Sequence, residues 1–96
     1  MHWADEAEDR ELMLNRFRRL VAELLRGQTK RNSFQAWEVE LLVDFDACAL
    51  PVRRRQDVLR QYQRAVERQL STEPGPPMKL SSFLVVREMR AKEKVS

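Results

Sequence analysis

The sequence predicts an all-α fold: a three-helix core with a short fourth helical segment after a proline-rich linker. Glycine is scarce, with two in 96 residues, whereas strands need turns that would use more of it. Charged residues reach 34% beside 43% hydrophobic residues, a mixture typical of helices with solvated faces. Apolar residues also recur at helical intervals in three long segments. A chain of this length forms one domain.

The first helix is expected at about residues 4–26. Acids crowd its start and bases its end, which is the order that the helix dipole favours. Gly27 should end it, because glycine readily takes the left-handed conformation after a last turn. A face wide enough for two neighbours, or for one neighbour and a second subunit, is formed by Met13, Leu14, Phe17, Leu20, Val21, Leu24 and Leu25.

The second helix, at about residues 33–49, lies in the most apolar part of the chain. At about 100° per residue it carries two opposite apolar stripes. One stripe is Phe34, Trp37, Leu41, Phe45 and Cys48, and the other is Ala36, Val39, Val43, Ala47 and Leu50. A helix that is apolar on two faces needs neighbours on both, so we expect this helix in the centre of the fold.

Local signals set the ends of the second helix. Asn32 and Gln35 have the spacing of a capping box, and Ser33 is the alternative cap. Leu50 should end the helix, because a residue before proline avoids the helical region. Pro51 can then occupy the first position of the next helix, where no N–H is needed.

The third helix is expected at about residues 51–70 and has one apolar side. Its stripe is Val58, Leu59, Tyr62, Ala65, Val66 and Leu70. Its opposite face holds Arg53, Asp57, Arg60, Arg64 and Arg68. One face therefore packs, and the other meets water or a partner.

Residues 1–70 would thus form the helical bundle, and residues 71–77 a linker. Three prolines and a glycine in that linker disfavour helix and favour a stiff, extended path. Residues 78–96 are expected to form a short helix and a frayed tail, with Ser81 or Ser82 as the cap and Leu80, Phe83, Leu84 and Met89 along one side. This segment either covers a groove on its own bundle or inserts into another subunit.

The sequence offers no catalytic, metal or cofactor constellation, and we expect a non-enzymatic protein. His2 and Cys48 are single residues of their types, and Cys48 falls on an apolar stripe where cysteine acts as a small hydrophobe. The acids of the second helix, Glu38, Glu40, Asp44 and Asp46, lack the histidine and second acidic helix of a carboxylate-bridged metal site. We expect these acids to face solvent or pair with arginines.

The arginine face of the third helix is the best candidate for function. Residues 51–70 carry six arginines and two acids, and residues 33–50 carry four acids and no base. Like charges repeated every four residues repel slightly, so a line of arginines has a small cost that a function would explain. Arg53, Arg60, Arg64 and Arg68 are therefore the candidate partner-binding residues.

Two functions fit that face. The first is a small protein–protein interaction module, an adaptor or regulatory subunit that docks an acidic partner through its helix faces. The alternative is nucleic-acid binding through the helix at 51–70, although a net charge of +3 is modest for that role. A homodimer is a further expectation, because the first two helices have wide apolar faces.

The N-terminal segment is acidic and lacks the apolar core of a secretory signal, so a cytoplasmic location is expected. No apolar run approaches the length of a membrane-spanning helix, and no membrane partner is expected. Trp3 lies in this charged terminus, where it either folds back on the first helix or marks an intermolecular contact.

Overall fold

The computed structural model describes residues 6–27, 34–73 and 75–95, with side chains for 10–27, 34–73 and 75–88. The described chain forms α1 (Glu6–Arg26), α2 (Ala36–Cys48), α3 (Val52–Thr72) and α4 (Leu80–Val95). No strand occurs within these ranges, so the all-α prediction is confirmed. The fourth helix has 16 residues and is longer than the short segment expected.

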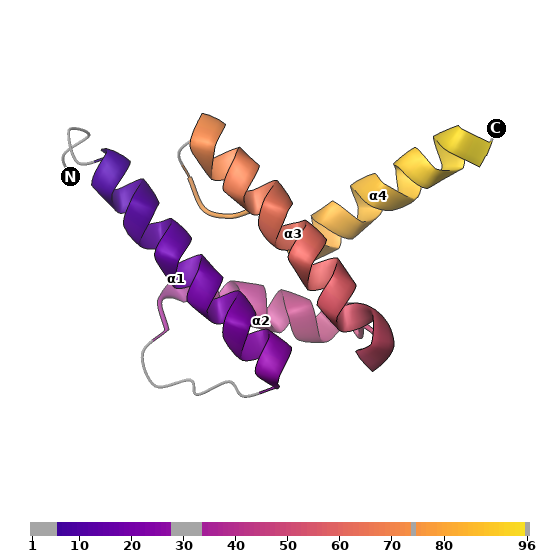
Figure 1. The fold of residues 1–96 in the computed structure, drawn as a ribbon, viewed down its shortest axis with the longest axis horizontal. Coiled ribbons are helices and arrows are strands. Elements are labelled where there is room, and N and C mark those ends of the chain that lie inside the picture. The colour runs from indigo at the N-terminus through magenta and orange to yellow at the C-terminus, as the bar shows by residue number, and fades with distance from the viewer. Residues whose placement is uncertain (1–5, 28–33, 74, 96) are drawn as a thin grey trace.

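The helices pack in two pairs, α1 against α3 and α2 against α4. Figure 1 shows α1 and α3 side by side and antiparallel in front, with α2 crossing behind them. The end of α4 points away from the other helices (Figure 1). The molecule is thin, with extents of 47 × 30 × 17 Å. Its shortest dimension has room for about two layers of helices, so a helix in the rear layer is packed on one side only.

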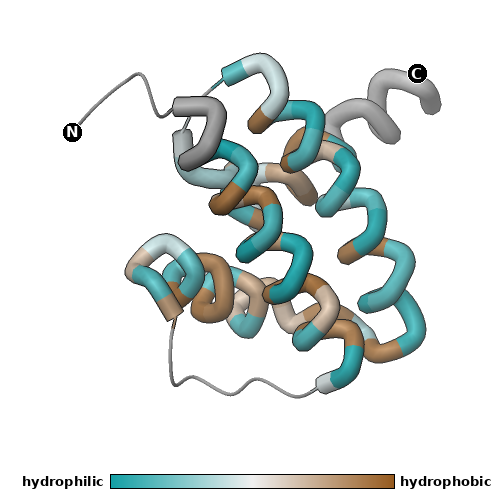
Figure 2. The backbone as a smooth tube through the Cα atoms, turned by 60° about the vertical axis from the view of Figure 1, so that its left-hand side comes forward, coloured by the Kyte–Doolittle hydropathy of each residue, from teal (hydrophilic) through white to brown (hydrophobic). Residues whose placement is uncertain are grey.

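The core lies between these pairs and draws most heavily on α3. Figure 2 shows hydrophobic positions recurring between hydrophilic ones along α1 and α3, as the predicted stripes require. The buried apolar residues are Phe17, Leu20, Val21 and Leu24 of α1, Leu41, Leu42 and Phe45 of α2, Val58, Leu59, Tyr62, Val66 and Leu70 of α3, and Leu80 of α4. The predicted stripes of α1 and α3 are therefore the packed faces, except that Leu25 at the edge of the α1 face is exposed.

The prediction that α2 is covered on both sides is wrong. Its first stripe packs inward, with Leu41 and Phe45 buried and Trp37 and Cys48 partly buried against the core. In the second stripe, however, Val39 is 47% exposed and Val43 is 61% exposed. In this thin fold the other helices cover one side of α2 only, and α3 contributes the largest number of buried apolar residues to the core.

Several helix ends differ from prediction by one to three residues. Asn32 and Ser33 lie outside the described residues, and α2 begins at Ala36 with Gln35 as its N-cap. The backbone N–H of Gln35 donates to Glu38 Oε1 at 2.9 Å, so the glutamate reaches back as in a capping box. Pro51 is the N-cap of α3 rather than its first residue.

The C-terminal ends of α1, α2 and α3 can also be compared with the prediction. Gly27 has a φ of 73°, as expected for a glycine that ends α1, and Ala49 takes a φ of 49° after α2. The third helix runs through Thr72, two residues into the expected linker. Ser71 and Thr72 hydroxyls donate to the Arg68 carbonyl, which satisfies an acceptor of the last turn.

The first turn of α4 is capped by another helix. Ser81 and Ser82 lie inside α4, which begins at Leu80, so neither is its N-cap. Instead Asp44 of α2 accepts a hydrogen bond from the Ser81 backbone N–H at 3.0 Å. Leu80 is 1% exposed within the core. The start of α4 therefore packs on its own chain, the first of the two alternatives that the sequence left open.

Candidate protein-docking groove

A groove of about 840 Å³ runs between α3 and the segment that leads into α4. It opens to solvent and has one wall from each helix. Its lining residues are Asp57, Arg60, Gln61, Arg64, Ala65 and Arg68 of α3, Met78 just before α4, and Phe83, Val86 and Arg87 of α4. The groove therefore combines a strongly basic wall with apolar side chains.

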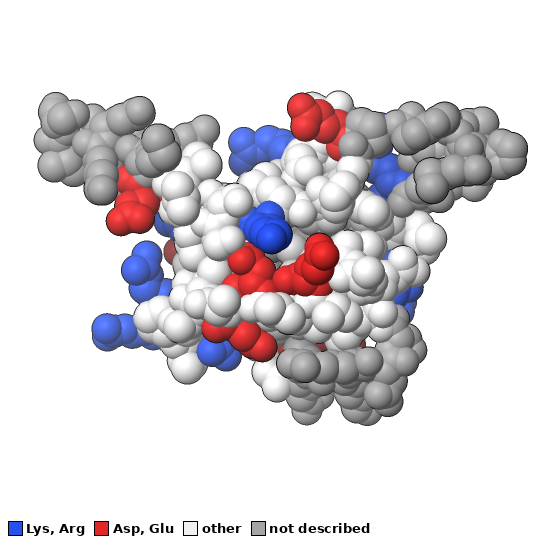
Figure 3. All heavy atoms as spheres, turned by 180° about the vertical axis from the view of Figure 1, so that it is seen from behind, with Lys and Arg blue, Asp and Glu red and all other residues white. Residues whose placement is uncertain are grey.

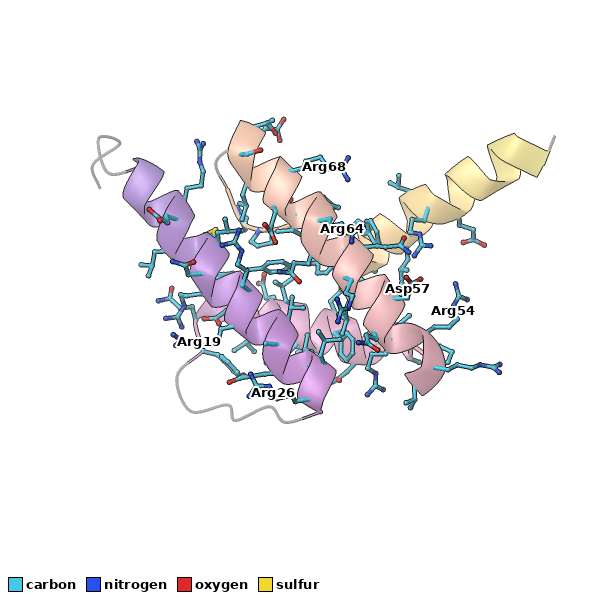
Figure 4. All side chains as sticks on the ribbon, in the orientation of Figure 1. Arg19, Arg26, Arg54, Asp57, Arg64 and Arg68 are labelled. Atoms are coloured by element: carbon cyan, nitrogen blue, oxygen red, sulfur yellow. The ribbon has the colours of Figure 1, made fainter. Side chains whose placement is uncertain are left out.

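The basic wall is the arginine line predicted from the sequence. Arg60, Arg64 and Arg68 repeat every four residues, so neighbouring Cβ atoms along the line lie about 5–6 Å apart. Figure 4 shows Arg64, Arg68 and Asp57 on the side of α3 that faces α4, while Arg19 and Arg26 lie on α1. All three arginines of the line are exposed.

These arginines have no acidic partner in the part of the chain that the structure describes. The ion pairs found there are Arg16–Glu38 and Arg18–Glu67, and both join other surfaces of the fold. Asp57, the acid of the groove, instead accepts a hydrogen bond from Gln61 Nε2 at 3.0 Å. The arginine line is thus available to carboxylates or phosphates from outside.

The other wall is apolar and ends in a fourth cation. Val86 is 48% exposed, and Phe83 and Met78 are partly buried. The Arg87 guanidinium lies 5.8 Å from the centre of the Phe83 ring. At that distance the cation is attracted to the ring face and holds the arginine at the rim of the groove.

Three hydrogen bonds fix the start of the apolar wall to α3. The Tyr62 hydroxyl donates to the Met78 carbonyl. Gln69 donates to the Pro76 carbonyl at 3.1 Å and accepts from the Met78 N–H at 2.9 Å. These bonds tie residues 76–78 to the middle and the last turn of α3.

Aromatic contacts continue from the groove into the core. The Tyr62 ring lies 5.7 Å from Phe83 and 5.5 Å from Phe17 of α1, measured between ring centres. Burial raises the pKa of the Tyr62 hydroxyl well above its usual range, and the negative charge of Asp44 adds to the effect. Tyr62 therefore stays a neutral donor.

The structure brings three of the four predicted site residues together. Arg60, Arg64 and Arg68 line the groove, whereas Arg53 is exposed near the start of α3 and outside the lining. Sequence reasoning missed Arg87 and the apolar wall of Met78, Phe83 and Val86. The apolar run after the prolines was a usable signal, but the sequence does not say against which helix it folds.

The acids of α2 behave in different ways. Glu38 is 3% exposed, and its Oε1 accepts from Arg16 Nε at 2.9 Å and Nη2 at 2.5 Å, as the expectation of arginine pairing requires. Asp44 caps α4, and Glu40 and Asp46 lie on the exposed side of α2. The described residues contain no group of three or more histidines, cysteines or acids that could hold a metal ion.

Other candidates from the sequence are structural or lie elsewhere. Cys48 packs against the core, and burial raises the pKa of its thiol, with a further contribution from the charge of Asp44. A thiol with a raised pKa is a poor nucleophile at neutral pH. His2 and Trp3 lie outside the described residues.

An ion pair on the opposite side of α3 joins it to α1. Arg18 Nη2 lies 2.8 Å from Glu67 Oε1, and Gln63 donates to the other carboxylate oxygen at 3.0 Å. The hydrogen bond from Arg18 holds the pKa of Glu67 below its ordinary value. Because this carboxylate is satisfied within the chain, it does not neutralise the groove.

Among the described helices, none combines the length and the apolar character needed to cross a lipid bilayer. Comparisons with protein-family models, with curated proteins and with solved structures gave no match to this chain. The case for a function therefore depends on the groove and the surfaces around it.

Proposed function

We propose that this protein is a small non-enzymatic interaction module, an adaptor or regulatory subunit, that docks an acidic segment of another protein in the groove between α3 and α4. The observation that carries the proposal is the arginine line of Arg60, Arg64 and Arg68, which has no acidic partner in the described chain and faces an apolar wall. We also propose a cytoplasmic location for this module. The free thiol of Cys48 fits that location, because the cytosol keeps thiols reduced.

The two walls favour a particular kind of ligand. Arginine guanidinium groups bind carboxylates in a fixed planar geometry, so the basic wall selects acidic side chains. The apolar wall of Met78, Phe83 and Val86 favours a ligand that also carries small or branched apolar side chains, because their contact removes apolar surface from water. An acidic amphipathic helix has both features, and helices that bind in grooves recognise them at one-turn intervals.

The test is affinity capture followed by identification of the bound proteins. The groove variant carries Arg60→Glu and Arg64→Glu, which replaces attraction by repulsion on the basic wall. The control variant carries Arg54→Glu, since Arg54 is an exposed arginine of α3 outside the groove. Circular dichroism checks that both variants keep the helical content of the wild type.

The proposal expects an acidic partner that binds the wild type and the control but is lost from the groove variant. If every captured protein binds the groove variant as well as it binds the control, the groove is not the docking surface. Binding should also weaken as salt is raised, because exposed charge pairs are screened.

The alternative function is nucleic-acid binding through the same arginines. Phosphate contacts would give affinity that falls steeply with ionic strength. Fluorescence anisotropy with duplex DNA and with RNA at about 50 mM salt separates the two functions, since non-specific electrostatic binding is strong there. We expect no binding, because Asp57 and the apolar wall would lie against a phosphate backbone.

A further inference from the structure

The exposed side of α2 is an apolar ridge with an acid on each flank. At about 100° per residue, Ala36, Val39, Val43 and Ala47 fall in one arc of the helix. Glu40 lies at one edge of that arc and Asp46 at the other, and all six residues are exposed. This face therefore has the features of the acidic amphipathic helix proposed above as the ligand of the groove.

Nothing in the described chain covers this ridge. Val39 and Val43 are among the exposed large apolar residues, and the inward stripe of α2 already fills the core. Figure 3, seen from behind, shows acidic side chains gathered near the middle of the face on which α2 lies, with basic side chains next to them and uncharged atoms over much of the rest. An exposed apolar surface of this kind is a candidate contact site.

The ridge and the groove are complementary in charge. Of the four acids of α2, Glu38 is bound by Arg16 and Asp44 caps α4, so Glu40 and Asp46 are the acids of the exposed side. The third helix carries six arginines and two acids. The ridge places acids on two flanks of an apolar centre. The groove places arginines on two walls, Arg64 and Arg68 on α3 and Arg87 on α4, around apolar side chains.

The second helix is also longer than the basic wall of the groove. The 13 residues of α2 span about 20 Å at a rise of 1.5 Å per residue. The groove arginines from Arg60 to Arg68 span about 12 Å along α3 by the same rise. One helix therefore suffices to run along the whole basic wall.

We infer that the occupant of the groove includes a second copy of this chain, whose α2 ridge docks between α3 and α4. The inference deepens the proposed function, since it uses the same groove and names one ligand for it. Self-association through this contact covers the groove, so an acidic partner protein would have to compete with the second copy.

The contact joins two different surfaces, which restricts the assemblies that can form. A residue of the ridge meets a residue of the groove and never its own counterpart. Two copies can exchange both contacts and close as a pair, or a single contact can repeat head to tail into longer oligomers. In each case every contact needs one intact ridge and one intact groove.

This requirement gives the test. The ridge variant carries Glu40→Arg and Val43→Arg, and the groove variant carries Arg64→Glu and Arg68→Glu. All four side chains are exposed, so neither variant disturbs the core. Val52→Arg is the matched control, because Val52 is a 79% exposed valine outside both surfaces.

The masses of the full-length proteins are measured by light scattering and sedimentation up to about 1 mM, a range that detects even millimolar dissociation constants. The wild type and the control should associate, and each variant alone should be monomeric. An equal mixture of the two variants should form a one-to-one complex through the ridge of one and the groove of the other. Circular dichroism verifies that each protein is folded.

Three outcomes would overturn the inference: a wild type that stays monomeric, a variant that associates like the control, or a mixture of variants that stays monomeric. Valine-to-valine packing between two α2 helices would show itself in a groove variant that still dimerises, which also overturns it. A monomeric wild type would leave capture of an acidic partner intact, so failure here is separable from failure of the proposed function.

Discussion

Single side chains in this fold decide how tightly the helices are joined. Tyr62 links three helices, because its ring contacts Phe17 and Phe83 and its hydroxyl holds the Met78 carbonyl. Glu38 joins α1 to α2 through its ion pair with Arg16. Its carboxylate also accepts a hydrogen bond from the backbone N–H of Gln35. Both residues combine burial with polar bonds, so both should matter more than their size suggests.

Tyr62 predicts a stability loss at alkaline pH. Its pKa is raised in the folded state and is about 10 in an unfolded chain, so the unfolded chain loses its proton first. Stability is therefore fully present below pH 10 and falls above it by about 1.4 kcal/mol per pH unit. Urea unfolding at pH 9 and pH 11 should show a smaller loss for Tyr62→Phe than for the wild type. Equal losses would show that Tyr62 is not the titrating group.

Glu38 predicts a stability difference between two neighbouring acids. Glu38→Gln removes a charged acceptor that is 3% exposed, and the free energy of unfolding should fall by about 1–3 kcal/mol. Glu40→Gln is the control, since an exposed surface change is usually within about 0.5 kcal/mol. Chemical denaturation of both variants measures the difference. Similar values for the two would mean that the Arg16 contact adds nothing.

At the scale of the helices, the sequence predicts where the apolar faces lie better than it predicts which faces other helices cover. The stripes of α1 and α3 are the packed faces, because each helix has one apolar side and no choice of orientation. The second helix has two apolar sides, and the pattern cannot say which one the rest of the chain reaches. The arginine line was predictable because its residues lie on one helix at a fixed spacing. The groove was not, because its second wall depends on the path of the chain after Pro76.

The two sides of α2 give a direct test of that orientation. Leu42 is 4% exposed, so Leu42→Ala should lower the free energy of unfolding by about 2–5 kcal/mol. Val43 is 61% exposed, so Val43→Ala should change it by less than about 0.5 kcal/mol. Urea denaturation of dilute protein measures both, because dilution removes any contribution from association. A large loss for Val43→Ala would place its side chain in a core.

The first turn of α4 depends on a cap from α2. Asp44→Ala removes the acceptor of the Ser81 N–H and should cost about 0.5–2 kcal/mol, as for an N-cap residue. The effect should be local, so amide hydrogen exchange should accelerate in the first turn of α4 more than in α1. Uniform acceleration, or none, would argue against the contact.

At the scale of the whole molecule, a thin fold leaves two surfaces of opposite character. One is the groove with its unneutralised arginines, and the other is the acidic ridge of α2. If these surfaces meet between copies, association should weaken as salt rises from about 50 mM to 500 mM, because the Debye length shortens over this range. Light scattering measures the trend. Association that strengthens with salt would indicate apolar packing alone.

The central claim is that the groove between α3 and α4 docks an acidic ligand. The most direct measurement is the affinity of a captured acidic partner for the wild type, the Arg60→Glu/Arg64→Glu variant and the Arg54→Glu control, by isothermal titration. Two reversed charges should weaken binding about ten- to hundredfold, and the control should stay within about twofold. Equal affinities for the groove variant and the control would contradict the claim.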